Sequence, residues 1–410
     1  MRDLDPTREQ AFFACFAKYY DLEHNTARRY APGEYTLDRM LPLAAAADHP
    51  ERLLKVLHVA GTKGKGSTCH FTAALLNAAG RRCGLFASPH LVTVRERFLI
   101  DGRLIDYDLL LHHAAAYEAE LRRRDLVPTL FEIMTILALR IFVSEGCEFA
   151  VMETGIGGRL DATNFVPDPV GCAITPVSLD HMALLGNTVE AIAVEKAGII
   201  KPRVPVVMAQ QPFPEAERVI RERATALAAP LVAPASDAEV QPFDPDNALV
   251  PFLRQNLAVA LALSRLPGLT PTPQHFRRPE LRARCEVIAT RPLVVLDAAH
   301  NADSARRLVE ALRRRWPGTH WTVVLGVLKG KDTAGIVREL APLDATFVLT
   351  NPHTPRESAL ASLEACARQA GLRTEVIPDL HERSQLAGRE PLLFTGSFFT
   401  ALIGEKLFGA

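Results

Sequence analysis

The 410-residue sequence has no C-x-x-C pair, no long hydrophobic run and no excess of charge of either sign. Its seven cysteines are scattered, which argues against a disulfide framework or a zinc site and favours a reducing compartment. The amino terminus is charged and lacks an apolar signal core, and no window reaches about eighteen uninterrupted apolar residues. These absences predict a cytoplasmic protein with no membrane partner.

Nucleic acid is not expected as a primary partner, because the charges balance and aromatic residues are few. The chain has 47 basic and 47 acidic residues, and aromatic residues make up 7% of it, with no basic stripe that interleaves them. The length suits two or three domains, each with enough chain to bury a core.

What the sequence does contain is an alternation of short apolar runs and amphipathic segments. This alternation is typical of right-handed βαβ units on a mostly parallel sheet. Gly80 and Gly198 follow helical patterns, where helix C-caps are expected. The first half is expected to form strands over Leu53–Ala60, Arg82–Phe86, Glu148–Glu153, Val170–Thr175 and Val204–Met208, and helices over 67–79, Tyr107–Arg124, Phe131–Glu145, Val189–Ala197 and Pro214–Ala228.

A change of texture marks the expected domain boundary. Proline-rich stretches occur over Pro230–Pro251 and Leu266–Pro273, on either side of a helical run over Leu253–Leu266, and the second reads as an extended linker. We therefore predict one domain over residues 1–275 and a second over 276–410. The second domain repeats the alternation, with strands over Leu293–Asp297, Trp321–Gly326, Ala345–Thr350 and Leu392–Phe394 and helices over Ala302–Arg315, Thr333–Leu340, 358–370 and Phe398–Phe408.

The segment Gly61-Thr62-Lys63-Gly64-Lys65-Gly66-Ser67-Thr68 joins the first strand to a helix and suits a nucleoside triphosphate. Glycines allow backbone N–H groups to surround phosphate oxygens, a lysine neutralises the outer phosphates, and a hydroxyl can hold Mg²⁺ at the helix N-terminus. The spacing departs from the Walker A pattern, because Gly66 separates Lys65 from Ser67. The alternative is a chance glycine turn between a strand and a helix.

Polar residues at the carboxyl ends of later strands are further candidates, because α/β folds place their chemistry there. Glu153 precedes the glycine-rich run 154–158 and suits Mg²⁺ coordination, or else it caps a loop. Asp180 and His181 follow the next strand and read either as a metal or substrate contact or as a hydrogen-bonded turn. Lys196 could simply complement a helix dipole, and Asp297 could bind a ribose or cap a helix.

Taken in order, these segments resemble the folylpolyglutamate synthase/dihydrofolate synthase family of the Mur ligase superfamily, essentially from end to end. The matching blocks are Gly61–Ser67, Ser88–Leu91, Glu153–Asn164, Leu179–His181, Glu195–Ile199, Leu296–Asn301 and Gly396–Ser397.

The resemblance implies the fold class as well as the activity. The fold would be α/β, with a P-loop ATPase-like, mostly parallel sheet domain and a smaller C-terminal Rossmann-like domain. The activity would be that of an ATP-dependent amide ligase that adds L-glutamate to dihydropteroate, to a folate, or to both, through an acyl phosphate. The partners would be these small molecules, and a monomer is expected. Two alternatives stay open at this point: a Mur-type ligase acting on a cell-wall precursor, and a P-loop ATPase that is not a ligase.

The resemblance also implies roles for particular residues. Lys65, Lys196 and His181 would be catalytic, with Lys196 carried as a carbamate. Two Mg²⁺ sites would use Ser88 and Glu153 for one ion and His181 for the other, and a K⁺ site is left open. The nucleotide contacts would be Gly61, Thr62, Lys63, Gly64, Lys65, Gly66, Ser67, Thr68, Asn256, Arg284 and Asp297, and the substrate contacts would be Thr129, Leu130, Phe131, Glu132, Leu160, Asp161, Ala162 and His300.

The chain departs from the family pattern at several of these positions. Lys63 stands where the family usually has Asn, which adds a second charge to the phosphate loop. Ala298 replaces the glycine of D-G-A-H, and Arg284 lacks the Pro-Gly that normally precedes it. Ala87 replaces the first serine of S-S-P-H, and Leu253 stands where a glutamine is usual.

Overall fold

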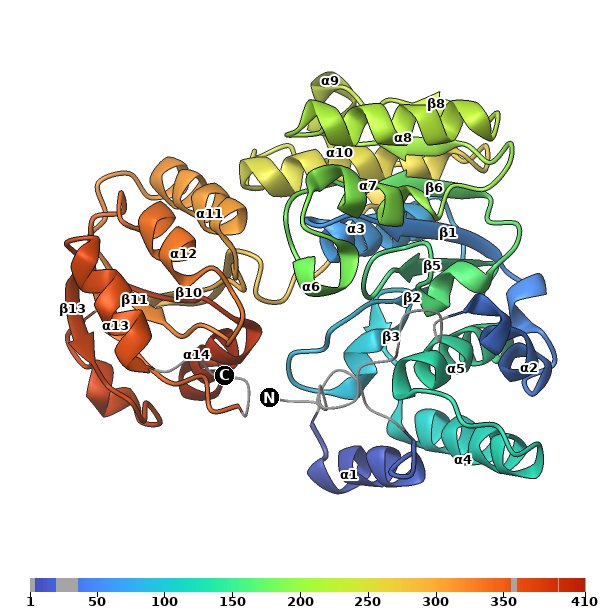
Figure 1. Ribbon diagram of the computed structural model, residues 1–410, viewed down its shortest axis with the longest axis horizontal. Helices are drawn as coiled ribbons and strands as arrows, with labels where there is room; N and C mark the ends of the chain where they lie inside the picture. Colours follow the sequence, from blue (N-terminus) through green and yellow to red (C-terminus); the bar gives the residue numbers. More distant parts are fainter. Residues whose placement is uncertain (1–3, 20–35, 355–359, 390, 410) are drawn as a thin grey trace. The chain divides into compact units, whose positions relative to one another are not determined.

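The computed structural model describes residues 4–19, 36–354, 360–389 and 391–409, which fall into two compact units (Figure 1). The N-terminal unit comprises Leu4–Leu249 and Leu253–Pro279, and Glu280–Ala410 supply most of the C-terminal unit. The units divide between Pro279 and Glu280, whereas composition placed the boundary near residue 275. Each unit has its own sheet.

The N-terminal unit is built on an eight-stranded sheet in the order β4-β3-β2-β5-β1-β6-β7-β8. Its six strands from β2 to β8 run parallel, and β3 and β4 are antiparallel at one edge. The strands are β1 Lys55–Ala60, β2 Cys83–Phe86, β3 Phe98–Ile100, β4 Arg103–Leu104, β5 Phe149–Glu153, β6 Gly171–Ile174, β7 Val206–Met208 and β8 Leu231–Val232.

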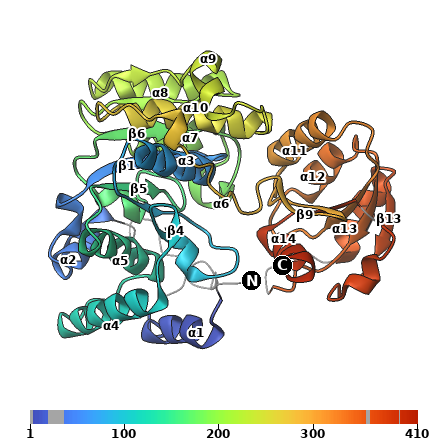
Figure 2. The same ribbon diagram turned by 180° about the vertical axis from the view of Figure 1, so that it is seen from behind.

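Helices cover both faces of this sheet, so its central strands are buried on both sides (Figures 1 and 2). Helices α4 and α5 cover one face over β2 and β5, and α7 and α8 cover the same face over β6 and β7, while α3 and α10 cover the opposite face. The helices of this unit are α1 Pro6–Cys15, α2 Met40–Ala45, α3 Lys65–Ala78, α4 Tyr107–Arg123, α5 Leu130–Ser144, α6 Met182–Leu185, α7 Val189–Ala197, α8 Pro214–Ala226, α9 Asp237–Val240 and α10 Pro251–Arg265.

The C-terminal unit is a six-stranded sheet in the order β13-β12-β11-β14-β10-β9, parallel except for the edge strand β9. Its strands are β9 Glu286–Thr290, β10 Leu293–Leu296, β11 Trp321–Leu325, β12 Ala345–Leu349, β13 Arg373–Val376 and β14 Leu392–Thr395. Its helices are α11 Ala302–Arg315, α12 Thr333–Leu340, α13 Leu360–Gln369 and α14 Phe398–Phe408. Short 3-10 turns complete the chain at Leu37–Arg39, Pro50–Arg52, Val94–Arg97, Ala162–Phe165, Gln241–Phe243, Pro273–His275 and Arg383–Leu386.

The α/β class and the buried parallel strands are confirmed, and two strands that the sequence missed share a physical reason. Strands β9 and β13 lie at sheet edges and are only partly buried, so they lack a continuous apolar run. The expected helix over 358–370 begins at Leu360 in the described chain, and residue 358 lies outside the described residues. The proline-rich stretch 230–251 holds β8 and α9, two short elements that the sequence analysis did not predict.

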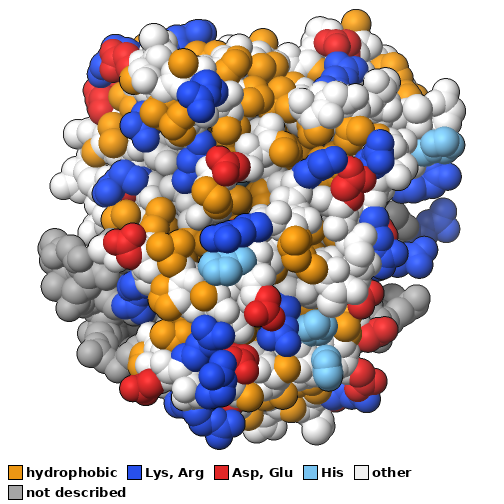
Figure 3. Space-filling model, turned by 90° about the vertical axis from the view of Figure 1, so that its right-hand side faces the viewer, with side chains coloured by type: hydrophobic (Ala, Val, Ile, Leu, Met, Phe, Trp, Pro, Cys, Tyr) orange, Lys and Arg blue, Asp and Glu red, His pale blue; other side chains and the backbone are white. Residues whose placement is uncertain are grey.

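No helix in the described ranges has both the length and the apolar character needed to cross a bilayer. On the face shown in Figure 3, basic and acidic side chains are interspersed with apolar ones.

The close approach of β2 and α5 generates a stability prediction at Gly84. A Cβ atom at this position would lie 2.2 Å from Cγ of Phe142, whose ring is fully buried. We expect Gly84→Ala to lower the free energy of unfolding by roughly 1–3 kcal/mol, because the ring must leave its packed position. Urea unfolding measures the loss. The double variant Gly84→Ala/Phe142→Leu should lose less than the sum of the two single changes, and strict additivity would contradict the clash.

Candidate active site

The phosphate loop follows β1 at the carboxyl edge of the sheet and is held from the neighbouring strand β6. The backbone N–H groups of Thr62 and Lys63 donate to the carbonyl of Pro176, at 3.0 and 3.1 Å. Thr62 Oγ1 donates to the carbonyl of Ser178 and accepts from its N–H, both at 3.1 Å. The loop is therefore preformed, and α3 begins directly after it at Lys65.

Two glycines of this loop are needed because other side chains approach it closely. Gly64 has φ +84°, and a Cβ there would lie 2.3 Å from Oδ1 of Asn256 on α10. A Cβ at Gly66 would lie 3.3 Å from Oε2 of Glu153, at the end of β5. The extra glycine that breaks the Walker A spacing thus makes room for this carboxylate. The structure brings Asn256 and Glu153 to the phosphate loop, as the sequence-based assignments require.

Four buried hydroxyls lie around the loop with no hydrogen-bond partner among the described residues. Ser67 and Thr68 begin α3, Thr154 follows β5, and Ser178 follows β6. Each is at most 5% exposed, and a buried polar group left unpaired costs about 1–3 kcal/mol. Such groups are suited to a ligand, and oxygen donors beside a carboxylate are what a divalent cation with bound phosphate prefers. The residues present therefore fit Mg²⁺ and a nucleotide.

The candidate metal ligands are only partly gathered. Glu153 is buried, and its Oε2 accepts a hydrogen bond from the Ser88 backbone N–H at 3.1 Å, so β5 and β2 deliver these two residues together. His181 follows β6 with φ +50°, its backbone N–H donates to Oδ1 of Asp180, and its ring is 42% exposed. Within the described ranges no cluster of three His, Cys, Asp or Glu side chains could hold a metal alone. A cation here would also need hydroxyl and phosphate oxygens.

Lys196 is buried near the lysines of the phosphate loop. Burial, together with the positive charge of Lys65, lowers the pKa of Lys196 to about 7, although Asp180 opposes the shift. The second loop lysine, Lys63, forms an ion pair with Asp180 at 3.4 Å, and both side chains are nearly buried. The added charge that distinguishes this loop is therefore balanced by a carboxylate.

The ends of β2 and α1 are organised by two carboxylates that the sequence reading did not single out. Glu96 accepts hydrogen bonds from the N–H groups of Leu91, Val92 and Thr93, at 2.7 to 2.9 Å. Glu9 of α1 accepts from the N–H of Val94 and from two hydroxyls, Thr93 Oγ1 and Tyr107 OH. The Thr93-x-x-Glu96 spacing is a capping-box signal that could have been found, whereas nothing local marks Glu9. Together they shape the loop that carries Ser88.

The glycine-rich loop after β5 packs directly on the end of α7, which carries Lys196. A Cβ at Gly158 would lie 2.7 Å from the carbonyl oxygen of Glu195, and one at Gly198 would lie 2.4 Å from Cβ of Arg159. Gly198 has φ −62°, so it is a right-handed cap, and its lack of a side chain is needed for packing rather than for a left-handed turn. Arg159 and Glu195 add an ion pair at 2.8 Å.

The expected substrate segment 129–132 lies at the start of α5, where two of its residues cap the helix and a third is partly exposed. Thr129 and Glu132 form a capping box, in which each side chain accepts the other's backbone N–H, and Glu132 also pairs with Arg39 at 3.3 Å. Leu130 is buried, while Phe131 is partly exposed and packs against Phe86 with the rings tilted by 47° and their centroids 5.7 Å apart. The Phe131 ring also abuts Gly155 of the glycine-rich loop. Phe131 is thus the residue of this segment best placed for a ligand.

In the C-terminal unit, Asp297 organises the loop before β9. Its carboxylate accepts hydrogen bonds from the N–H groups of Cys285 and Ala299, both at 2.8 Å. The N-cap of α11 is Asn301, which accepts from the N–H of Ser304, so the capping role considered for Asp297 is wrong. The Arg284 guanidinium lies 4.7 Å from the Phe398 ring centroid, and His300 Nδ1 lies 2.9 Å from the carbonyl oxygen of Ala298.

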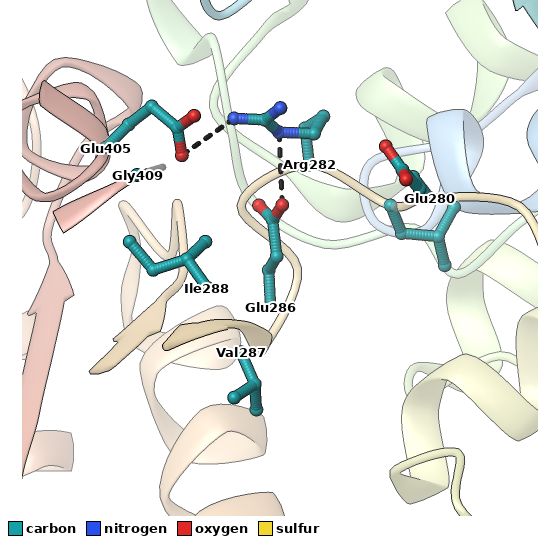
Figure 4. Close-up of a pocket in the computed structure, with 8 residues that line it drawn as sticks. Glu280, Arg282, Glu286, Val287, Ile288, Glu405 and Gly409 are labelled. Carbon is teal, nitrogen blue, oxygen red and sulfur yellow. Dashed lines mark ion pairs between the residues drawn. The ribbon is translucent and has the colours of Figure 1, made fainter. Parts of the chain in front are cut away.

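The loop before β9, which also carries Arg284, lines a pocket in this unit and is anchored there by ion pairs (Figure 4). Arg282 pairs with Glu286 at 3.1 Å and with Glu405 of α14 at 2.8 Å. Glu286 also accepts a hydrogen bond from the backbone N–H of Ala283, and burial raises its pKa. Sequence reasoning missed this set, because Glu405 lies far along the chain from Arg282.

Comparisons with known proteins agree with the family resemblance. Residues 283–392 match the family described as "Mur ligase, glutamate ligase domain". The dihydrofolate synthase/folylpolyglutamate synthase of Bacillus subtilis is 32% identical over 408 residues, which cover 90% of this chain and 94% of that protein.

Solved structures give the same result. The folylpolyglutamate synthase of Mycobacterium tuberculosis complexed with ADP superposes with a TM-score of 0.83 at 25% identity, over 98% of this chain and 99% of that one. The bifunctional folylpolyglutamate synthase/dihydrofolate synthase of Yersinia pestis, complexed with AMPPNP and an Mn ion, superposes with a TM-score of 0.80 at 30% identity, over 96% and 97%.

The loop before β9 generates a stability prediction. Ala283 has φ +50°, a left-handed conformation that costs a residue with a side chain roughly 1–2 kcal/mol. We expect Ala283→Gly to raise the free energy of unfolding by about 1 kcal/mol, measured by calorimetry or urea unfolding. Ala311→Gly, inside α11, should change stability in the opposite direction by a similar amount. A loss of stability in Ala283→Gly would contradict the strain.

Proposed function

The chain belongs to the folylpolyglutamate synthase/dihydrofolate synthase family, and we propose that the residues around its phosphate loop carry out the family's reaction. It is an ATP-dependent ligase that joins L-glutamate to folates. The observation that carries the site assignment is Glu153, buried beside Gly66 and bonded to Ser88, with unpaired hydroxyls around it.

Phosphate binding follows from the geometry of residues 61–68. The backbone N–H groups at the start of α3 and the Lys65 ammonium would hold the phosphates, while Ser67 and Thr68 would supply hydroxyl oxygens. Glu153 and Ser88 would hold one divalent cation and His181 a second. A bound cation would supply charge neutralisation on the phosphate oxygens. Asn256 would contact the adenine, Arg284 the phosphate side and Asp297 the ribose side of the nucleotide.

The proposed reaction needs alignment and charge neutralisation rather than a strong base. The acceptor carboxylate takes the γ-phosphoryl group of ATP, which forms an acyl phosphate and releases ADP. The amine of glutamate attacks the acyl carbon, and inorganic phosphate leaves as the amide forms. Lys65 would stabilise the charge that builds on the transferring group. His300 and the segment 160–162 would bind the acceptor and glutamate, and Phe131 offers an aromatic face to the pterin.

Lys196 is proposed to carry a carbamate. Because its pKa is about 7, a substantial fraction of the amine is neutral at neutral pH, and a neutral amine can attack CO₂. A carbamate would place a negative charge close to the positive charges of Lys65 and Lys63. The buried site would thereby become electrostatically balanced.

For the molecule that accepts glutamate, we propose dihydropteroate, reduced folates or both. Phosphate release is measured with ATP, Mg²⁺ and glutamate, with dihydropteroate in one reaction and tetrahydrofolate in another. Mass spectrometry of the products counts the glutamates added. A protein that consumes ATP with neither acceptor would contradict the proposal. The expectation of a cytoplasmic location, which came from composition, and the separate expectation of a monomer stay predictions.

Lys65 generates the first functional prediction. We expect Lys65→Ala to lower kcat by roughly 10²-fold or more, because one electrostatic donor to the transferring phosphoryl group is lost. Phosphate release under saturating substrates measures it. Lys55→Ala is the matched control, since Lys55 is an exposed lysine at the start of β1 that pairs with Glu148, just before β5, and the activity of this variant should be unchanged. Normal turnover in Lys65→Ala would remove this lysine from its role.

Lys196 generates a pH prediction. With carbon-13 bicarbonate, a carbamate signal should be seen by NMR above about pH 7 and should fall as the pH is lowered through that value, because the protonated amine cannot attack CO₂. Lys196→Arg should abolish the signal. Lys201→Arg, a second lysine whose pKa is lowered by burial, should keep it. A signal that survives in Lys196→Arg would place the carbamate elsewhere.

A further inference from the structure

A buried hydrogen-bond chain connects the phosphate-loop strand to the glycine-rich loop. His58 lies on β1, three residues before Gly61, and Thr163 and Asp161 lie in and before the 3-10 turn Ala162–Phe165. His58 Nε2 lies 2.8 Å from Thr163 Oγ1, which lies 2.5 Å from Oδ1 of Asp161. All three side chains are buried, at 1%, 0% and 7% exposure.

The direction of each hydrogen bond follows from the chemistry of the groups. The Asp161 carboxylate accepts from the Thr163 hydroxyl, so that hydroxyl must in turn accept from His58. His58 therefore carries its proton on Nε2. Burial lowers the pKa of His58 to about 3, so the ring is neutral at physiological pH and acts as a donor without charge.

Asp161 links this chain of side chains to the backbone of the glycine-rich loop. Its Oδ2 accepts hydrogen bonds from the N–H groups of Gly155 and Ile156, at 2.9 and 3.0 Å, and its Oδ1 also accepts from the N–H of Thr163 at 3.0 Å. With the Thr163 hydroxyl, four donors occupy a carboxylate that has about four acceptor positions. The Asp161 carboxylate is thus committed to the shape of the glycine-rich loop, so any contact of the segment 160–162 with the acceptor would come from its other atoms.

We propose that His58 and Thr163 are positioning residues, which hold the glycine-rich loop in the shape that binds the pterin-containing acceptor. This inference rests on the proposed function and adds two residues to it. The loop tip they control abuts Phe131, the aromatic residue assigned to the pterin, through Gly155. The far end of the segment is held independently, because Lys201 Nζ donates to the carbonyl of Asn164 at 2.9 Å. Loss of the Thr163 hydroxyl should therefore release the tip and leave the rest of the fold in place.

The test compares Thr163→Val with Thr163→Ser in the full chain. Valine has nearly the same shape but no hydroxyl, and serine keeps the hydroxyl. We expect Thr163→Val to raise KM for the pterin acceptor by roughly tenfold, with KM for ATP changed less than about twofold, because the two partners of the hydroxyl, His58 on β1 and Asp161 beside the glycine-rich loop, both lie outside the phosphate loop 61–68. Thr163→Ser should restore most of the affinity. Ser264→Ala, which removes another buried hydroxyl in α10, should leave both constants unchanged.

The connection to His58 is tested by a double-mutant cycle. His58→Leu removes the donor, whereas His58→Gln can place an amide N–H near the same position. His58→Leu/Thr163→Val should raise the acceptor KM no more than the worse single variant, because both break one chain of hydrogen bonds. His58→Gln should be milder than His58→Leu. If the fold-changes in acceptor KM of the two single variants simply multiply in the double variant, the proposed hydrogen-bond chain is wrong.

Equilibrium binding of the pterin acceptor, followed by fluorescence without turnover, separates this inference from the proposed function. If the unchanged protein binds and extends no acceptor, the proposed function fails. If it does so but Thr163→Val raises both KM values equally, or lowers only the melting temperature, the positioning role fails. Should Thr163→Val not fold, Thr163→Ala and the His58 pair decide the question by the same criteria.

Discussion

The whole site depends on the burial of one carboxylate where three parallel strands end. Glu153 closes β5, pairs in register with Val59 of β1, and lies against Gly66 and the Ser88 backbone. Because the strands are parallel and adjacent, their polar ends meet at a single edge of the sheet. Gly66 leaves room for this carboxylate, while Gly64 leaves room for Asn256 and the carbonyls of Pro176 and Ser178 hold the loop before α3.

Much of the architecture could be predicted from the sequence, for reasons visible in particular elements. Strand β1 is buried on both faces, so it reads as a continuous apolar run, and its carboxyl end could be located. Edge strand β13 alternates exposed and half-buried residues and gave no such run. The loop of residues 61–68 was found from the sequence because glycine and lysine spacing is local, and its role in phosphate binding stays a prediction. Partners such as Glu9 and Thr93, or Arg282 and Glu405, were not, since contacts between distant segments leave no local pattern.

The departures from the family pattern have local compensation. Lys63 brings an extra positive charge into the phosphate loop, and Asp180 lies 3.4 Å away to balance it. Ala283 adopts a conformation that suits glycine, and hydrogen bonds to Glu286 and from Ala298 hold its backbone on both sides. At these two positions, neighbouring groups thus balance the added charge and hold the strained backbone.

The contact between the glycine-rich loop and α7 has a mechanical consequence. At Gly158 and Gly198 main chain meets main chain or the root of a side chain, with no compressible side-chain layer between them. Two such surfaces can slide only by separating, because packed interiors have little free volume. The glycine-rich loop and the end of α7 should consequently shift together as one rigid piece, so that any displacement of this loop also moves Lys196.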